Sequence, residues 1–135
     1  MTVARTGTRT LLLCGYYGEN NLGDDALLQV LLQQIPANFG LLITANDREA
    51  LRQLAPMAES VSRRSLGSVL GAVGRADALI LGGGSLLQDS TSLRSLIYYL
   101  LLIVTARIQR RPILLWGQGL GPLNRPISRW LVRQV

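Results

Sequence analysis

The chain has 135 residues, which suits one domain, and 48% of them are hydrophobic while 16% are charged, so the composition excludes an intrinsically disordered protein. Its 14 glycines follow no fixed period, which excludes collagen-like and low-complexity proteins. The net charge of +6 comes from 14 basic residues that are all arginine, but aromatic residues make up 5% and no signature of a nucleic-acid-binding module is present, so we expect no nucleic-acid partner.

Apolar runs of strand length alternate with stretches of helical periodicity along the chain. The predicted elements are, in chain order, a strand over 10–14, a helix over 24–34, a strand over 41–45, helices over 47–54 and 65–73, a strand over 77–81, a helix over 92–109, a strand over 113–116 and a helix over 126–135. We expect Asp24 to cap the first of these helices and Pro126 to occupy the first turn of the last one. The helix over 65–73 is the weakest of the set because Gly67 and Gly71 interrupt it.

The predicted strands are apolar throughout rather than alternating, so both faces of their sheet should be covered by helices. Together with the alternation of strands and helices, this predicts the α/β class with a doubly wound, Rossmann-like parallel sheet. Cys14 ends the first strand, where we expect a small buried hydrophobic side chain, and a single cysteine fits a reducing, cytoplasmic setting. The most apolar stretch, 96–106, is too short to span a bilayer.

Three of the predicted strands end in glycine-rich loops, and the carboxyl ends of parallel strands meet at the edge where open α/β sheets bind ligands. The first loop covers residues 15–25 and carries polar and aromatic side chains. Asp24 and Asp25 stand at the start of the following helix, where they would repel phosphate and bind the free amides themselves. The loop is therefore either a surface that binds the hydroxyls of a sugar or a tight glycine turn before a capped helix.

The other two loops are also rich in glycine. The second, over 82–92, begins with three consecutive glycines, whose exposed amides could bind an anion or a sugar ring. In the alternative interpretation Asp89, Ser90 or Ser92 caps the next helix. The third loop, over 117–122, has the glycine density of a dinucleotide fingerprint without its spacing, so we expect close backbone packing with Gln118 pointing into the cleft.

The absence of histidine and lysine limits the chemistry of these residues. It excludes an imidazole base, a Schiff-base lysine, a Walker lysine and a histidine-bound metal within the chain. Eight carboxylates, four tyrosines and one cysteine are left for acid–base work, and none of them forms a cluster of metal ligands in the sequence. We expect neither a metal nor a cofactor.

Three arginines of the last predicted helix, Arg125, Arg129 and Arg133, lie four residues apart and so share one helix face. This face is either solvated or in contact with an anionic lipid or a lipid-linked diphosphate. The second alternative would make the protein a peripheral partner of a membrane.

Three strings occur in order between Leu11 and Pro126: GYYGENNLGDDALL, LGGGSLLQDSTS with YYL after it, and GQGLGPL. Together they resemble the polysaccharide pyruvyl transferase family, in particular its bacterial branch that anchors the surface layer to the cell wall. Members of the family are considerably longer, and this chain resembles their N-terminal half. Asp25 departs from the pattern, because the family more often has glutamate there.

The resemblance implies two Rossmann-like domains that face each other across a cleft, as in the glycosyltransferase-B fold. Residues 1–135 would be the N-terminal, acceptor-side domain, and the C-terminal donor-binding domain would be absent from this chain. The last predicted helix fits this expectation, since it reaches Val135 without a cap or a helix stop.

The resemblance also implies the reaction. Enzymes of the family transfer pyruvate as a ketal from phosphoenolpyruvate, a co-substrate, onto two hydroxyls of a sugar, and they release phosphate. The expected acceptor is an N-acetylmannosamine-type unit of a cell-wall glycan or of its lipid-linked precursor. The expected location is the cytoplasm, at the inner face of the membrane.

Proton transfer and donor binding in such a reaction call for histidine and for cations, so we expect these 135 residues to bind the acceptor and not to catalyse the transfer alone. Asp24 or Asp89 would act as the base toward the acceptor hydroxyl, and no other catalytic residue is assigned. The residues carried over as substrate-binding are Gly15, Tyr16, Tyr17, Asn20, Asn21, Asp24, Gly82, Gly83, Gly84, Gln88, Asp89 and Gln118.

Two further functions stay open at this stage. One is a nucleotide-sugar glycosyltransferase of the same architecture, which would use a different donor. The other is a truncated, non-catalytic binding module. An acidic ribose-binding pattern after Val135 would favour the glycosyltransferase, whereas a second βα domain with histidine would favour the pyruvyl transferase.

Overall fold

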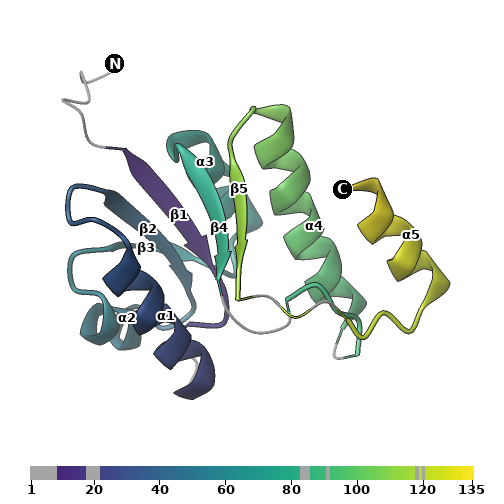
Figure 1. Ribbon diagram of the computed structural model, residues 1–135, viewed down its shortest axis with the longest axis horizontal. Coiled ribbons are helices and arrows are strands. Elements are labelled where there is room, and N and C mark those ends of the chain that lie inside the picture. The colour runs from purple at the N-terminus through teal and green to yellow at the C-terminus, as the bar shows by residue number, and fades with distance from the viewer. Residues whose placement is uncertain (1–8, 18–21, 83–85, 91, 118, 120) are drawn as a thin grey trace.

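Five parallel strands form one sheet in the order β3-β2-β1-β4-β5, with helices on both faces (Figure 1). The computed structural model describes residues 9–17, 22–82, 86–90, 92–117, 119 and 121–135. In chain order its elements are β1 (Thr10–Cys14), α1 (Leu22–Gln34), β2 (Gly40–Ala45), α2 (Arg48–Leu54), β3 (Glu59–Ser62), α3 (Leu66–Arg75), β4 (Ala78–Gly82), α4 (Leu93–Ile108), β5 (Ile113–Trp116) and α5 (Pro126–Gln134). The prediction of a doubly wound, Rossmann-like sheet is confirmed.

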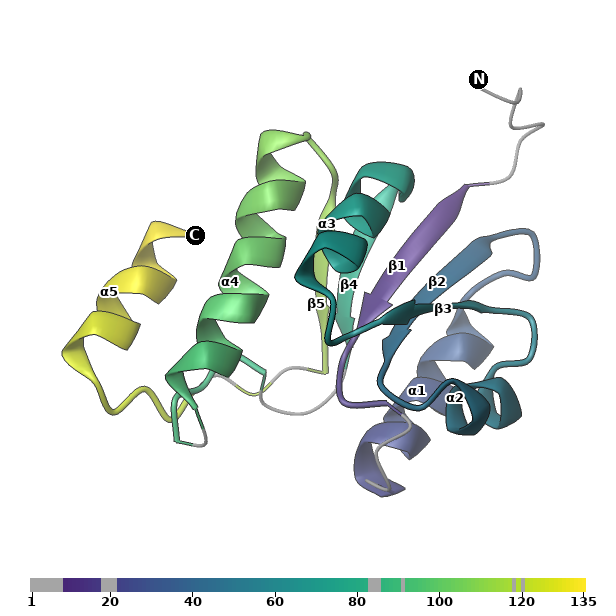
Figure 2. The same cartoon turned by 180° about the vertical axis from the view of Figure 1, so that it is seen from behind.

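Each face of the sheet has its own core because successive side chains of a strand point to opposite faces. Leu13 of β1 and Ile80 of β4 are in register and pack with Leu28 of α1 on the face that α1 and α2 cover. Leu12 and Leu79, the pair one residue earlier, pack on the face that α3 and α4 cover (Figure 2). Continuous apolar strands are therefore buried on both faces, as the sequence predicts.

Most predicted elements are confirmed, and two predictions are wrong. The helix expected from residue 24 begins at Leu22, so Asp24 lies in its first turn and is not its N-cap. The strand β3 has no counterpart among the predicted elements, since Glu59–Ser62 contains a single apolar residue, Val61, which is the buried one. This edge strand pairs with β2, from Leu42 opposite Glu59 onward.

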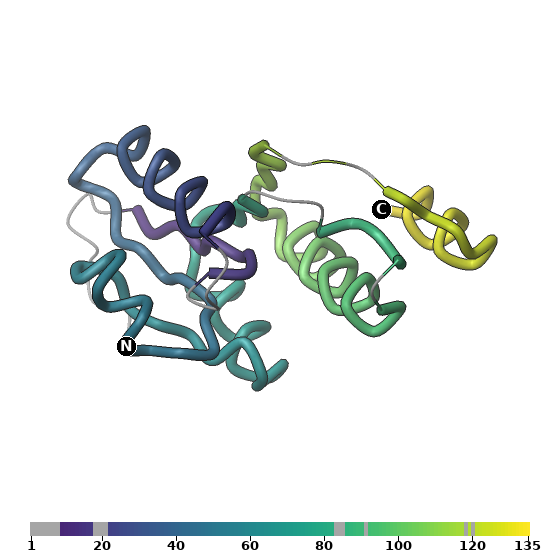
Figure 3. The backbone as a smooth tube through the Cα atoms, turned by 90° about the horizontal axis from the view of Figure 1, so that it is seen from below, coloured from purple at the N-terminus to yellow at the C-terminus, as the bar shows by residue number. Residues whose placement is uncertain are grey.

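All neighbouring strands are parallel, and β1, β4 and β5 run downward in Figure 1, so the view from below in Figure 3 looks onto the edge where the strands end. We call this edge the carboxyl edge. The strand β1 lies between β2 and β4, and the connections from β1 and β4 pass to opposite faces of the sheet. Such a switch in connection opens a crevice at the carboxyl edge, which is where ligands bind in sheets of this type.

The helix α5 packs on α4 and stands apart from the sheet (Figure 1). The edge strand β5 leaves Leu114 and Leu115 about half exposed, and α5 exposes Ile127 and Trp130. Within the described residues, no helix combines the length and the apolar character that crossing a membrane requires.

Candidate functional site at the carboxyl edge

Tyr17 links the first two glycine-rich loops from within the core. Its side chain is 1% exposed, and its hydroxyl donates a hydrogen bond of 2.5 Å to the carbonyl of Gly82 at the end of β4. Burial raises the pKa of this phenol well above its ordinary value, and the buried Cys14 and the Asp24 carboxylate add to the rise. The hydroxyl therefore stays protonated and acts as a permanent donor. This placement gives Tyr17 a structural role beneath the loops.

Gly15 and Gly82 are the residues that make room for the Tyr17 ring. A Cβ at Gly15 would lie 2.6 Å from Cζ of that ring and 2.9 Å from the Gly82 carbonyl oxygen. A Cβ at Gly82 would lie 2.5 Å from the Tyr17 hydroxyl and 2.9 Å from Cδ2 of Leu31. These distances are shorter than carbon atoms tolerate, so the close approach of β1, β4 and Tyr17 requires glycine at both positions.

Asp89, in the second loop, holds the start of α5. Its Oδ1 accepts a hydrogen bond from the amide of Asn124, and its Oδ2 accepts one from the amide of Arg125, each of 2.8 Å. The nearby Ser128 hydroxyl, which has the largest effect, and the hydrogen bonds from these two amides lower the pKa of Asp89 from 3.8 to about 2. A carboxylate whose oxygens are engaged in this way is a weak base, so the arrangement favours a structural role for Asp89.

The second and third loops are also joined through their backbones. The amide of Gly121 donates to the carbonyl of Leu87 at 3.0 Å, and the amide of Asp89 donates to the carbonyl of Pro122 at 3.1 Å. Gly121 has a φ of +83°, a conformation that favours glycine. The loops after β4 and β5 thus lie side by side at the carboxyl edge.

Replacing Asp89 with asparagine should loosen α5. The wild-type carboxylate stabilises the fold fully above its unfolded pKa near 3.8, and this contribution is lost as the pH falls toward the folded value of about 2. The variant should therefore unfold at a lower temperature at pH 7 and depend less on pH between 4 and 2. Amide hydrogen exchange in Pro126–Gln134 should become faster while exchange in β1 stays unchanged. Unchanged exchange in α5 would contradict the role that we assign to Asp89.

The other predicted site residues are placed as follows. Asp24 is half-buried in the first turn of α1, and Gln88 is buried, with its side-chain oxygen accepting a 2.7 Å hydrogen bond from the amide of Ser90. Tyr16 is half-buried at the end of β1. Five predicted residues lie outside the described part of the chain: Asn20, Asn21, Gly83, Gly84 and Gln118.

Tyr16 lines a hollow of about 480 Å³ at the carboxyl edge, on the side of the sheet that α3 and α4 cover. We call this hollow the arginine pocket. It lies among the ends of β1, β2 and β3 and the first turns of α4. Its lining residues are Tyr16, Asn46, Arg63, Arg64, Arg94, Ser95 and Tyr98. They include three guanidinium groups and no carboxylate, so the pocket is positively charged.

Contacts with tyrosines fix the position of Arg63 in this pocket. Its guanidinium carbon lies 3.9 Å from the centroid of the Tyr16 ring, and its Nη2 donates to the Tyr99 hydroxyl at 3.4 Å. Tyr16 is itself held by a 2.6 Å hydrogen bond between its hydroxyl and Oγ of Ser95. A guanidinium stacked on an aromatic ring loses little further freedom when it binds a ligand.

Tyr98 and Tyr99 come from the middle of α4 and pack edge to face, with ring centroids 5.0 Å apart. Tyr99 is fully buried, whereas Tyr98 reaches the arginine pocket. Burial raises the pKa of both hydroxyls, and the charge of Arg63 opposes part of that rise. The buried Tyr98 hydroxyl has no hydrogen-bond partner among the residues that the structure describes.

Sequence reasoning missed most of the arginine pocket, although a signal was present. Arg63 and Arg64 directly follow β3, which is absent from the elements that the sequence predicts. With that strand in place, parallel pairing would have located both arginines at the carboxyl edge. Arg94 and Ser95 follow Ser92, which is the N-cap of α4 as one interpretation expected.

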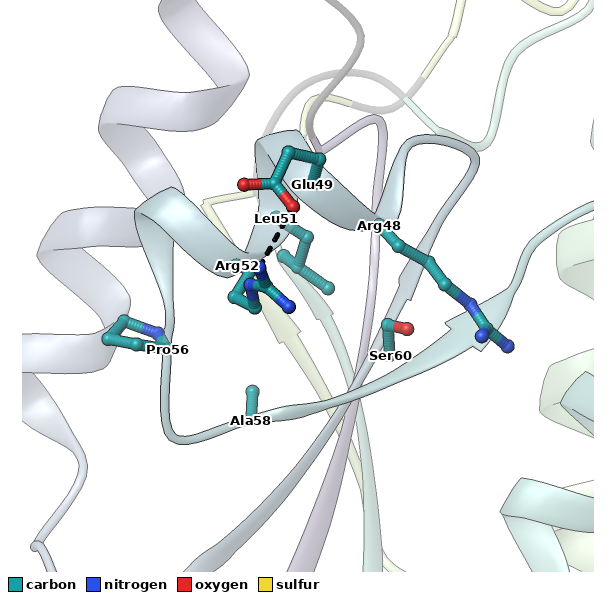
Figure 4. Close-up of a pocket in the computed structure, with 7 residues that line it drawn as sticks. All are labelled: Arg48, Glu49, Leu51, Arg52, Pro56, Ala58 and Ser60. Carbon is teal, nitrogen blue, oxygen red and sulfur yellow. Dashed lines mark ion pairs between the residues drawn. The ribbon is translucent and has the colours of Figure 1, made fainter.

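Other hollows differ from the arginine pocket in charge and place. Figure 4 shows a smaller one, of about 180 Å³, between α2 and β3, where Arg52 forms a 3.2 Å ion pair with Glu49 and Arg48 extends away from that pair. A third hollow, of about 440 Å³, is lined mostly by apolar side chains, among them Pro36, Phe39 and Met57 beside the amino ends of β2 and β3. Neither of these two hollows is lined by three arginines without a carboxylate, as the arginine pocket is.

Cys14 is unsuited to nucleophilic chemistry. It is fully buried, and burial raises the pKa of its thiol from 9.0 to about 12 despite a hydrogen bond with Thr44 and the charge of Arg63. The expectation of a small buried hydrophobic side chain is confirmed. In the described part of the chain, no three acidic or cysteine side chains gather in a way that could hold a metal ion.

Comparison of the chain with known proteins gave a match to one family model. The family model described as polysaccharide pyruvyl transferase matches residues 21–135, which is most of the chain. The match includes the second and third loops and every residue of the arginine pocket except Tyr16. The curated proteins and the solved structures gave no match.

Proposed function

From the premise that the chain belongs to the polysaccharide pyruvyl transferase family, we propose that it takes part in moving pyruvate from phosphoenolpyruvate onto a sugar of a polysaccharide or of its precursor. The carboxyl edge is where we place substrate binding. The observation that carries this placement is the arginine pocket, which adjoins the end of β1 at the switch point of the sheet. Polar, positively charged and aromatic groups converge there, as a site for an anionic sugar substrate requires.

The proposed reaction forms two bonds between sugar oxygens and the former enol carbon of phosphoenolpyruvate. The bond between that carbon and the phosphate oxygen breaks, and phosphate leaves. The methylene carbon gains one proton to become a methyl group, and the two sugar hydroxyls lose one proton each. One of these protons balances the methyl group and the other leaves with phosphate, so the ketal forms without an oxidant or a reductant.

The described side chains are better suited to binding than to proton transfer. The chain contains no histidine or lysine, and its buried tyrosines stay protonated because burial raises their pKa. Of the two carboxylates considered as bases, Asp89 is engaged with α5. Asp24 stays a prediction that rests on the resemblance to the family. We propose that this domain binds the acceptor and that a second, donor-binding domain supplies the acid and the remaining cations.

For the acceptor we propose an N-acetylmannosamine-type sugar on a lipid-linked precursor, at the cytoplasmic face of the membrane. Support comes from α5, where Arg129 and Arg133 are exposed together with Ile127 and Trp130. Basic side chains beside exposed aromatic and aliphatic ones favour contact with an anionic lipid surface. The same surface would place the carboxyl edge near a lipid-linked sugar.

The transfer is tested with the full-length protein, phosphoenolpyruvate and an N-acetylmannosaminyl acceptor. We expect phosphate release that depends on the acceptor, and an acceptor whose mass increases by one pyruvate less one water. Phosphoenolpyruvate without acceptor and pyruvate with acceptor are the controls, and both should give no product. Turnover of a nucleotide sugar in place of phosphoenolpyruvate would contradict the proposal.

A further inference from the structure

We propose that the arginine pocket is a binding site for a phosphoryl group, held by Arg63, Arg64 and Arg94. This inference deepens the proposed function, and rests on it in one respect: both substrates of that reaction can carry phosphate. Phosphoenolpyruvate has a phosphate ester, and a lipid-linked sugar has a diphosphate. The site is therefore defined by its chemistry, and the experiment below distinguishes the two sources.

The charge of the pocket is the first argument. Among the described residues, Arg64 and Arg94 make no ion pair, and both are exposed at the rim. Two arginines outside the pocket pair with carboxylates, Arg52 with Glu49 at 3.2 Å and Arg75 with Glu59 at 3.1 Å. The guanidinium groups of Arg64 and Arg94 lie in the same pocket as that of Arg63, and these like charges repel one another. Binding of a ligand with at least two negative charges would relieve this repulsion.

The geometry of the pocket is the second argument. The three guanidinium groups come from two separate segments, the end of β3 and the first turn of α4, and they surround a hollow of about 480 Å³. Arg63 is already fixed on the Tyr16 ring at 3.9 Å. A planar guanidinium presents paired donors that match the oxygens of phosphate, and a tetrahedral group can accept from several directions at once.

The start of α4 adds a third source of positive potential. The helix has 16 residues, and its N-cap Ser92 accepts a hydrogen bond from the amide of Ser95, which lines the pocket. The amino end of a helix carries a partial positive charge that favours phosphate. Tyr98 also lines the hollow and contributes part of its aromatic wall.

The volume of the hollow and its mixed lining fit a phosphoryl group attached to a sugar or an enol acid. A free carboxylate carries a single charge, whereas a phosphate ester carries up to two and can match both Arg64 and Arg94, which form no ion pair within the described residues. Asn46 and the Ser95 hydroxyl provide neutral groups for the part of the ligand beyond the phosphate. We therefore expect phosphate esters to bind and their dephosphorylated analogues not to bind.

The experiment measures binding by calorimetry to the full chain at low ionic strength. Pyrophosphate tests the phosphoryl chemistry alone, while phosphoenolpyruvate and a hexose 1-phosphate represent the donor and the acceptor. Pyruvate and the free hexose are the matched ligands without phosphate. We expect binding of pyrophosphate and of at least one ester, no binding of the matched ligands, and an affinity that falls as salt is added.

The variants are R64A, R94A and R63A. The control for loss of one exposed charge is R110A, because Arg110 lies just past the C-terminal end of α4 whereas the pocket lies at the first turns of that helix. Each pocket variant should weaken pyrophosphate binding by roughly tenfold or more, because charge-assisted hydrogen bonds to phosphate are lost. R110A should bind as the wild type does. Arg64 and Arg94 are exposed, so their variants should unfold at the wild-type temperature.

Equal affinity in all variants, an equal loss in R110A, or no binding of any phosphoryl ligand by the wild type would overturn the proposal. The two proposals fail separately. Pocket-dependent pyrophosphate binding without pyruvyl transfer would leave the phosphoryl site and contradict the function. Pyruvyl transfer that R64A and R94A leave unchanged, with pyrophosphate binding also unchanged, would leave the function and contradict the site.

Discussion

Gly15→Ala should lower the free energy of unfolding by about 3 kcal/mol, the upper end of the usual cost of overpacking a core, because the new methyl group has no space. Its carbon would lie 2.6 Å from the Tyr17 ring and 2.9 Å from a backbone oxygen of Gly82. The ring is buried and the oxygen belongs to β4, so neither can move without opening the contact between the two central strands. Urea unfolding followed by circular dichroism measures the change.

Gly71→Ala is the matched control for that experiment. Gly71 lies inside α3 and is exposed, and a methyl group added there would meet no atom within 4 Å. The same substitution there should raise the free energy of unfolding by roughly 0.5–1 kcal/mol, since alanine favours a helix over glycine. Equal effects of the two substitutions would contradict the close packing that we describe around Tyr17.

Tyr17→Phe should lower the free energy of unfolding by about 1–3 kcal/mol while leaving substrate binding unchanged. The substitution removes the donor of the 2.5 Å hydrogen bond and leaves the Gly82 carbonyl without that partner in the core. Tyr17 is 1% exposed, so its hydroxyl is remote from a ligand at the surface. Chemical unfolding measures the free energy of unfolding of the variant, and the KM for the acceptor reports on substrate binding.

Tyr16→Phe is the control, with the opposite pattern expected. It removes the hydroxyl that is hydrogen-bonded to Oγ of Ser95 beside the arginine pocket, and it retains the aromatic ring on which Arg63 lies. Its stability should change by less than about 1 kcal/mol, while the KM for a phosphoryl substrate rises. A raised KM for Tyr17→Phe at unchanged stability would instead support the role in substrate binding that the sequence suggested for Tyr17.

The apolar strands of the fold were easier to predict than the edge strand β3 or the start of α1. Continuous apolar segments such as Thr10–Cys14 and Ile113–Trp116 identify buried parallel strands from composition alone. The edge strand Glu59–Ser62 carries no such signal, because its pairing with β2 depends on tertiary contacts. The start of α1 differs from the predicted one for a related reason: Leu22 is exposed and adds nothing to the apolar periodicity.

The sequence predicts that its candidate residues gather at the carboxyl edge, but it does not distinguish the roles of adjacent residues there. Tyr16 and Tyr17 are neighbours in a polar loop, yet one lines a pocket and the other fills the core. Asp89 follows three glycines, as a ligand-binding residue could, and instead holds α5. Arg63 and Arg94 are far apart in the sequence and meet only because β3 ends and α4 begins at the same edge.

The central claim is that substrates bind at the carboxyl edge of the sheet, and amide spectra of the protein titrated with phosphoenolpyruvate or a phosphorylated sugar test it most directly. We predict that the largest chemical-shift changes fall on Tyr16, Arg64 and Ser95, around the arginine pocket. Changes confined to the opposite edge, where Pro36 and Phe39 line the apolar hollow, would contradict it.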